Sequence, residues 1–238
     1  MGLSHSPKIV TNGLVLALDA ANNKSYPGSG TSWNDLSGNS NTGTLTNGPT
    51  FSTGNLGSIV FDGVDDQIEC GTNSSLNISD NLSLGIWVKF NSISSSPNLI
   101  AKQWCSGNQF SYNWSILSDG RMYYGFDSDG FCGSITGEYT STNAVCTTGI
   151  WYYLNVVHTS TSINLYSNGV SIPGTLAGSY GTIYISSVPV RLGVYRNLSG
   201  AFAGYLSGNI AQSVIYNRAL SSKEVLQNYN ATKSRFGL

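Results

Sequence analysis

Residues 58–70 read SIVFDGVDDQIEC. Ile59 and Phe61 alternate with small or polar neighbours, and the same alternation resumes at Ile68, which is the period-two pattern of β-strands. The Asp-Gly pair between them favours a tight turn, because glycine adopts positive φ at little cost. The stretch therefore predicts strand, acidic turn and strand, with three carboxylates close together.

Similar patterns extend along most of the chain. Residues 84–90 alternate apolar and other side chains, which predicts a strand with one buried face. The pairs Asp119-Gly120 and Asn168-Gly169 suit the type I′ turns of two β-hairpins. Further strands are expected at 14–18, 151–158, 190–195 and 210–216, and a long loop is expected over 26–48.

One helix is expected near the end of the chain. Ser221 and Glu224 form a capping box, and Val225, Leu226 and Tyr229 follow at helical spacing. Many short strands with regular turns and no helical crossovers predict an all-β fold. We expect an antiparallel two-sheet jelly-roll sandwich with one short C-terminal helix.

The composition excludes some classes of function. Only 10% of the 238 residues are charged and the formal net charge is −1, and the basic residues are scattered singly, so no nucleic-acid partner is expected. Residues 1–8 lack the basic and apolar regions of a secretory signal. The apolar run at 14–18 is too short to cross a membrane. We therefore expect neither a signal peptide nor a membrane segment.

The cysteines are expected to be free thiols. None of the four forms a C-x-x-C pair, which argues against a zinc site. Three of them fall within residues 105–146, where they can approach one another. In a chain without a signal peptide, free and mostly buried thiols are favoured over disulfides. The four residues are Cys70, Cys105, Cys132 and Cys146.

Five motifs together resemble a known family. They are FDGVDD at 61–66, LGIWVK at 84–89, WYYL at 151–154, LYSNG at 165–169 and GNIAQSVIYNRALS at 208–221. In this order they resemble the laminin-G-like, or concanavalin-A-like lectin/glucanase, jelly-roll domains. The resemblance implies a single such domain over 13–238, preceded by an N-terminal extension over 1–12.

The beginning and the end of the chain narrow this resemblance. The stretches are GLVLALDA at 13–20, KSYPGSGTSW at 24–33, DLSGNSN at 35–41, LTNGPTF at 45–51 and KSRFGL at 233–238. They are similar to the version of the domain found in structural proteins of tailed bacteriophages. This implies a virion component, namely a head decoration, fibre or tail protein that assembles with other virion proteins in the host cytoplasm. Head or tail location, and whether a homo-oligomer forms, stay open.

Two polar segments are candidate calcium sites. Asp62, Asp65 and Asp66 supply three carboxylates in one turn, and Ca²⁺ prefers such hard oxygen ligands. Asp35 and Asn39 lie in a glycine-containing loop with alternating oxygen-bearing side chains. The resemblance implies one calcium ion at the rim of the sandwich. The alternative is a turn without metal, in which the aspartates cap backbone amides.

Aromatic side chains are candidate platforms for a glycan. Trp104 adjoins a glycine-containing loop, and Trp33 and Tyr26 lie in the long loop over 26–48. A second aromatic group shares one strand face and is interpreted as core, because alternating aromatic residues of a strand pack together. Its members are Phe110, Tyr112 and Trp114.

Catalysis is not expected. Glycoside hydrolysis generally requires two carboxylates about 5–10 Å apart. The resemblance implies that these would be glutamates near one another along a strand, as in the glucanases. The only glutamates are Glu69, Glu138 and Glu224, and no two of them are close in sequence. Together with the resemblance to phage proteins, this gives the first hypothesis: a non-enzymatic bacteriophage virion protein that contacts host-surface glycans. The alternative is a carbohydrate-binding adhesion module of a cell-surface or secreted protein.

Overall fold

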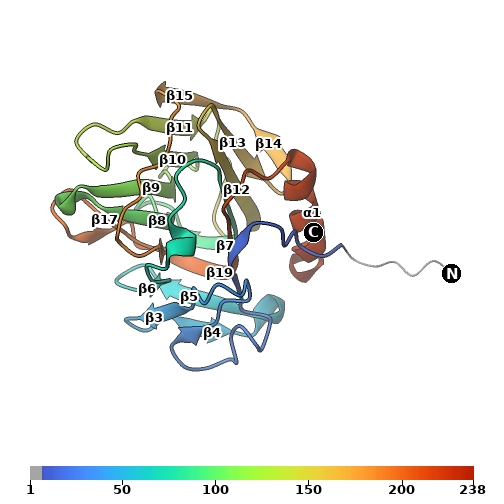
Figure 1. The fold of residues 1–238 in the computed structure, drawn as a ribbon. Coiled ribbons are helices and arrows are strands. Elements are labelled where there is room, and N and C mark those ends of the chain that lie inside the picture. Colours follow the sequence, from blue (N-terminus) through green and yellow to red (C-terminus); the bar gives the residue numbers. More distant parts are fainter. Residues whose placement is uncertain (1–6) are drawn as a thin grey trace.

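Two antiparallel sheets stack face to face in the computed structural model, which describes residues 7–238 (Figure 1). The first sheet has the strand order β14-β13-β12-β7-β19-β5-β4, and β1 pairs with β19. Its strands are β1 (Leu14–Asp19), β4 (Thr50–Ser52), β5 (Ser58–Asp62), β7 (Leu82–Ser92), β12 (Trp151–Thr159), β13 (Ser162–Ser167), β14 (Val170–Ile172) and β19 (Ser207–Tyr216).

The second sheet has the order β15-β11-β10-β9-β8-β16-β6-β3-β2; in addition, β17 pairs with β8, and β18 pairs with β17. It is antiparallel except where β17 runs parallel to β8 and Arg196 pairs with Trp104. Its strands are β2 (Ser32–Trp33), β3 (Gly43–Thr46), β6 (Gln67–Glu69), β8 (Asn98–Trp104), β9 (Gln109–Ile116), β10 (Met122–Phe126), β11 (Gly137–Ser141), β15 (Gly174–Gly178), β16 (Arg191–Leu192), β17 (Tyr195–Arg196) and β18 (Phe202–Ala203). The expected two-sheet jelly-roll sandwich is confirmed.

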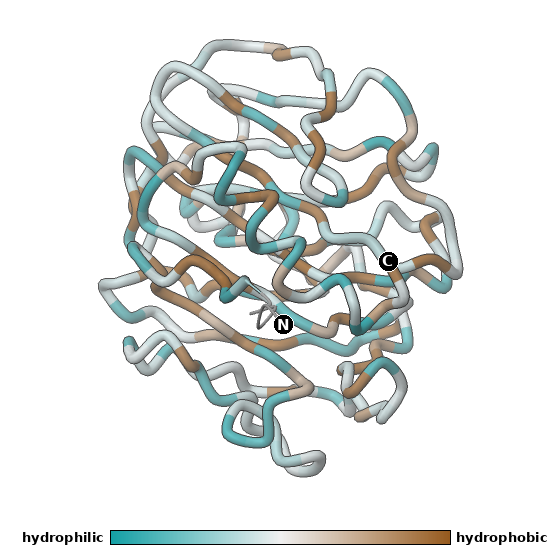
Figure 2. Tube along the Cα trace, turned by 90° about the vertical axis from the view of Figure 1, so that its right-hand side faces the viewer, coloured by the Kyte–Doolittle hydropathy of each residue, from teal (hydrophilic) through white to brown (hydrophobic). Residues whose placement is uncertain are grey.

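The main core lies between the two sheets, and hydrophobic segments of the chain run through the inside of the molecule (Figure 2). Central strand β7 contributes Ile86 and Val88 to this core. The opposite face of β7 is buried too, because Trp87 stacks on Phe236 with ring centroids 4.0 Å apart. Trp87 Nε1 also donates a hydrogen bond of 2.7 Å to Thr232 Oγ1. The end of the chain therefore covers the outer face of the first sheet.

Helix α1 (Ser222–Thr232) begins at the expected capping box, in which the Ser221 side chain accepts from the Glu224 amide. The other half of the box is present as well, and Arg218 adds an ion pair to Glu224 at 2.6 Å. Val225 is buried as expected, whereas Leu226 is 43% exposed and lies off the packed face. Short 3₁₀ helices complete the chain: η1 (Gly54–Leu56), η2 (Ser74–Leu76), η3 (Cys105–Gly107) and η4 (Lys233–Phe236).

The two expected hairpin turns differ in type. Asn168 and Gly169 have φ values of 51° and 79°, as a type I′ turn requires. At the other hairpin only Gly120 has positive φ, and the Leu117 amide donates to the Arg121 carbonyl at 2.8 Å across a three-residue loop. The type I′ expectation is therefore wrong for Asp119-Gly120, because three residues rather than two separate the paired ends.

Two expected segments are also interrupted. The long loop over 26–48 contains the short strands β2 and β3. The strand expected over 190–195 breaks at Gly193, whose φ is +81°, so that β16 and β17 are separate. Because glycine tolerates this backbone conformation, the chain turns there and β17 lies beside β8.

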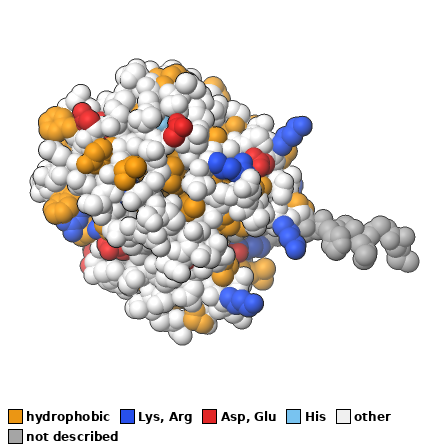
Figure 3. Space-filling view, in the orientation of Figure 1, with side chains coloured by type: hydrophobic (Ala, Val, Ile, Leu, Met, Phe, Trp, Pro, Cys, Tyr) orange, Lys and Arg blue, Asp and Glu red, His pale blue; other side chains and the backbone are white. Residues whose placement is uncertain are grey.

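Within the expected extension 1–12, residues 1–6 lie outside the described part of the chain. The rest lies against the helix side of the molecule: the Val10 amide donates to Asn228 Oδ1, and Tyr216 donates to the Val10 carbonyl, both at 2.8 Å. Across residues 7–238, every helix is too short or too polar to span a membrane. The surface in Figure 3 consists mainly of neutral polar side chains and backbone.

Candidate functional site

A groove with a volume of about 640 Å³ opens on the outer face of the second sheet. Alternation along β9 creates its floor, because Asn113 and Ser115 face the groove while Trp114 faces the core. Residues 195–199 form part of its lining. The full lining is Ser96, Gln103, Cys105, Phe110, Asn113, Ser115, Leu117, Tyr123, Cys132, Ile135, Tyr195, Asn197, Leu198 and Ser199.

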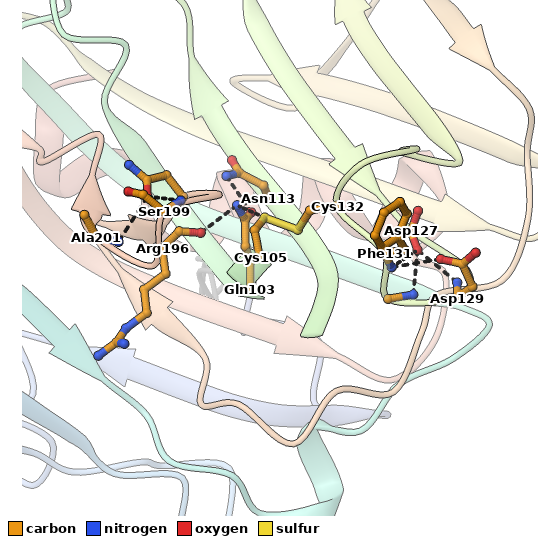
Figure 4. The surroundings of a disulfide bond; sticks show 12 residues. Gln103, Cys105, Asn113, Asp127, Asp129, Phe131, Cys132, Arg196, Ser199 and Ala201 are labelled. Carbon is orange, nitrogen blue, oxygen red and sulfur yellow. Dashed lines mark hydrogen bonds between the residues drawn. A yellow bond between two sulfur atoms is a disulfide. The ribbon is translucent and has the colours of Figure 1, made fainter. Parts of the chain in front are cut away.

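Buried side-chain amides form a ladder across this floor. Asn98 Nδ2 donates to Asn113 Oδ1 at 2.8 Å, and Asn113 Nδ2 donates to Gln103 Oε1 at 2.9 Å. Gln103 Nε2 donates in turn to the Arg196 carbonyl at 3.0 Å, so the ladder joins three strands (Figure 4). Since each amide is at least nine-tenths buried, its donors and acceptors keep fixed directions.

Two tyrosines that the sequence did not single out line the groove. Tyr123 donates a 2.7 Å hydrogen bond to Glu138 Oε1. Burial raises the pKa of Tyr123, and the hydrogen bond and charge of Glu138 raise it further. Tyr195 enters from β17. The alternation in β10 separates Tyr123 from core residue Tyr124, but this signal identifies a groove only once the sheet is known.

A disulfide between Cys105 and Cys132 borders the groove (Figure 4). The two Cα atoms are 5.2 Å apart, and both residues pack with Phe110 and Ile135 in a small apolar cluster. The expectation of four free thiols is wrong for this pair. The cysteines are 27 positions apart in the chain. Cys105 follows β8 and Cys132 follows β10, and both strands pair with β9, which brings the two residues together.

The other two cysteines are free and buried, as expected. Cys70 and Cys146 are no more than 2% exposed. Burial raises the pKa of Cys146 to about 12. These thiols are therefore protonated at neutral pH, and they lie in the main core between the sheets.

The loop that carries Cys132 is held together by the side chain of Asp127. Asp127 has no exposed surface, and its carboxylate accepts hydrogen bonds from several backbone amides, as an aspartate in a turn commonly does. The Gly130 amide makes the shortest of these, at 2.6 Å. The other donors are the amides of Asp129, Phe131 and Thr136 (Figure 4).

The aromatic candidates have different outcomes. Trp33 is 0% exposed and Tyr26 is 3% exposed, so both belong to the core and their assignment as glycan platforms is wrong. The loop that carries them folds inward: Tyr26 packs on Phe51 with ring centroids 5.3 Å apart. Trp104 is 39% exposed and lines a second pocket beside the groove. The core interpretation is confirmed for Tyr112 and Trp114, which lie in the main core. Phe110 is buried too, but it packs with the disulfide and lines the groove.

The acidic turn between β5 and β6 brings three carboxylates together. Oxygens of Asp62, Asp65 and Asp66 lie within 4.8 Å of one another. Asp62 Oδ1 accepts from the Val64 amide at 2.8 Å, and Asp66 Oδ2 accepts from the Asp62 amide at 2.9 Å. Burial and the charges of its two neighbours raise the pKa of Asp66, while the backbone hydrogen bond opposes this. The oxygens that accept no hydrogen bond fit a hard cation such as Ca²⁺.

Asp35 lies outside that carboxylate cluster, in the loop that also carries Asn39. Both Asp35 oxygens accept backbone hydrogen bonds, including one of 2.8 Å from the Ala17 amide and one of 3.0 Å from the Asn41 amide. Asn39 Nδ2 donates to the Leu14 carbonyl at 3.3 Å. These side chains tie the loop to β1. Calcium binding by this second segment stays a prediction.

A family model described as "Concanavalin A-like lectin/glucanases superfamily" matches residues 62–226. This is more than half of the chain and includes every strand that forms the groove. No curated protein matches the sequence.

Several solved structures have a similar fold. The binding domain of Paraclostridial Mosquitocidal Protein 1 has a TM-score of 0.68 and 18% identity, over 93% of this chain and 52% of that chain. Domain 4 of AbnA, an extracellular arabinanase from Geobacillus stearothermophilus solved with arabinotriose, has a TM-score of 0.67 and 18% identity, over 91% of this chain and 98% of that domain.

A structure concerning botulinum neurotoxin type C, whose cell entry depends on two ganglioside molecules, has a TM-score of 0.69 and 13% identity, over 94% of this chain and 52% of that chain. This chain therefore spans about half the length of the two toxin structures. At such identities the similarity concerns the fold alone.

Proposed function

This chain belongs to the concanavalin A-like lectin/glucanase superfamily, and from that premise we propose that it is a non-enzymatic domain that binds a glycan in the groove over β8–β10. The observation that carries the proposal is the ladder of Asn98, Asn113 and Gln103 beneath the groove. Sugar hydroxyls both donate and accept hydrogen bonds, and the ladder leaves Asn113 a second N–H and a second lone pair on its oxygen for them.

The size and lining of the groove support a small-molecule ligand. Its volume of about 640 Å³ is in the usual range for ligand pockets, roughly 300–1,000 Å³. Tyr123, Tyr195 and Leu198 add apolar surface beside the amides. The related AbnA domain was solved with arabinotriose, which supports a sugar as the class of ligand.

The same lining supports binding without hydrolysis. Hydrolysis of a glycosidic bond generally requires two carboxylates on either side of it. None of the described residues that line the groove is Asp or Glu. Glu138 approaches through Tyr123, and a single carboxylate does not supply both the acid and the base or nucleophile.

The test compares two buried asparagines. Asn113→Ala removes the centre of the ladder, whereas Asn155→Ala removes a 1% exposed asparagine of the first sheet that donates to the Leu84 carbonyl. Each change leaves buried groups unpaired and costs stability of about 1–3 kcal/mol. On a glycan array and in calorimetry, only Asn113→Ala should weaken binding, by about tenfold or more. Folded Asn113→Ala protein with unchanged affinity would rule out the groove.

We also propose that this domain acts on the surface of a bacteriophage virion, together with other virion proteins. The support is the resemblance of stretches within residues 13–51, and of residues 233–238, to phage structural proteins. The solved structures described above are toxin and enzyme domains and add no support to this part. The Cys105–Cys132 disulfide is compatible with a position outside the reducing cytoplasm. Immunogold labelling of purified particles tests this, and unlabelled particles would refute it.

A calcium ion at the acidic turn is the third part of the proposal. Asp65 and the free oxygens of Asp62 and Asp66 would hold it. Bound there, the ion would offset the mutual repulsion of three carboxylates and stabilise the connection between β5 and β6. The proposal for the groove does not depend on this ion.

A further inference from the structure

A second pocket of about 380 Å³ adjoins the groove: Trp104 lines this pocket, and the preceding residue, Gln103, lines the groove. Trp104 contributes the largest exposed apolar side chain of its lining. Two arginines, Arg191 and Arg196, contribute its charge. Gln109 and Ser187 add polar groups to the lining.

The positive charge of this pocket is only partly compensated. Arg191 forms an ion pair of 2.9 Å with Glu69, and its side chain is 8% exposed. Arg196 forms no salt bridge with any residue between 7 and 238. Burial lowers the pKa of Arg191; the charge of Glu69 opposes this effect, and the nearby charge of Arg196 adds to it. Of the two guanidinium groups, only that of Arg191 is therefore paired with a carboxylate.

Both arginines also have donors without partners. The Nε atoms of Arg191 and Arg196 are buried, and neither finds an acceptor in the described chain. Leaving a buried charged donor unpaired is costly, so such groups usually have a ligand or ordered water. Gln109 adds a third donor: its Oε1 accepts from the Ser187 amide at 2.8 Å, and its side-chain amide nitrogen makes no bond within residues 7–238.

The fold holds Arg196 firmly in this position. Its carbonyl accepts the hydrogen bond from Gln103, and its guanidinium points away from the amide ladder (Figure 4). The guanidinium carbon lies 4.4 Å from the ring centre of Phe202 and 5.2 Å from that of Trp104. An arginine packed against two aromatic rings has fewer orientations open to its planar fork of donors.

We propose that this pocket binds the anionic group of an acidic sugar, a carboxylate or a sulfate ester. The donors of Arg196 and Gln109 and the buried Nε of Arg191 would receive the oxyanion, and Trp104 would contact the sugar carbon atoms. Guanidinium groups suit such oxyanions because they donate two hydrogen bonds in one plane. The inference rests on the proposed glycan binding and adds a preference for acidic over neutral glycans.

The neutral groove and the charged pocket are neighbours on the same strands. Gln103 lines the groove and its neighbour Trp104 lines the pocket. Likewise, Asn197 lines the groove and its neighbour Arg196 lines the pocket. One oligosaccharide that places neutral units over the amides and its acidic unit beside Arg196 would use both. The chain has no basic run and a net charge of −1, which disfavours an extended polyanion such as nucleic acid.

The test uses an array of glycans printed in pairs that differ only by one carboxylate or one sulfate, followed by calorimetry of the best pair. Wild-type protein should bind the acidic member at least about tenfold more tightly, since hydrogen bonds to charged groups are the strong ones. Separate carboxylate and sulfate pairs identify which oxyanion is recognised.

Three variants assign the preference to this pocket. Arg196→Gln should abolish it, and Arg196→Lys, which keeps the charge but not the planar fork, should reduce it. Lys223→Gln removes the same charge from an exposed helix position, and it should leave the preference unchanged, because salt screens distant charges. Affinity measured at 0.15 M salt separates local recognition from long-range attraction.

Each outcome has a definite meaning. Equal binding of acidic and neutral members, or a preference that survives Arg196→Gln, would overturn the acidic pocket and leave the groove proposal standing. Absence of binding to every printed glycan would refute the groove proposal and this inference together. If Arg196→Gln does not fold, a preference that Arg196→Lys leaves unchanged would overturn the inference.

Discussion

Reduction of the Cys105–Cys132 disulfide should destabilise the domain substantially. The bond joins residues 27 positions apart, and the chain-entropy relation gives about 3.5 kcal/mol for a loop of that length at 25 °C. For a chain of 238 residues, an unfolding entropy of about 2.1 cal/mol/K per residue gives about 0.5 kcal/mol/K. The melting temperature should therefore fall by about 7 °C.

The assay is differential scanning calorimetry with and without a phosphine reductant. The double variant Cys105→Ser with Cys132→Ser should melt close to reduced wild-type protein, and the reductant should not shift its transition. Cys70 and Cys146 remain as free thiols in both proteins. Four alkylated thiols in unfolded, never-reduced protein would refute the pairing. A shift below about 2 °C on confirmed reduction would refute the entropy argument.

Two further predictions concern ionisation and metal. His158 is fully buried, and burial lowers its pKa to about 4 despite the hydrogen bond to Gly181. The unfolded chain then binds the extra proton first, so about 3 kcal/mol of stability that is present above pH 6.5 is lost as the pH falls toward 4. Urea titrations should show this slope in wild-type protein but not in His158→Gln, and equal slopes would contradict it. If calcium occupies the acidic turn, EGTA should lower the melting temperature of wild-type protein but not of Asp65→Asn; no shift would exclude a tightly bound ion.

The position of the site could be predicted from the sequence only in part. Trp104 was singled out from its place beside a glycine-containing loop, and it is half-exposed at a pocket. Trp33 and Tyr26 have the same local appearance and are buried. The difference is set by where the loop packs, since Tyr26 lies against Phe51, a residue outside the loop.

The acidic turn illustrates the same limit. The spacing of Asp62, Asp65 and Asp66 places their carboxylates together, and the structure confirms that cluster. Asp35 and Asn39 resemble ligands equally well in sequence. In the structure, Asp35 accepts hydrogen bonds from backbone amides of β1 and of its own loop, and the Asn39 side chain donates to a backbone carbonyl of β1. A ligand-like pattern does not reveal which backbone groups compete for the same oxygens.

The sequence by itself determined the features that depend on near neighbours. Period-two alternation set the strands, Asn168-Gly169 set a type I′ turn, and the capping box from Ser221 to Glu224 set the start of the helix. The tertiary structure alone decided the groove, the disulfide and the charged pocket. These depend on residues far apart in the chain, such as Gln103 and Arg196, which are 93 positions apart and are joined by one hydrogen bond. Such contacts form only when the chain turns at Gly193 and β17 lies beside β8. No local pattern specifies which strands become neighbours.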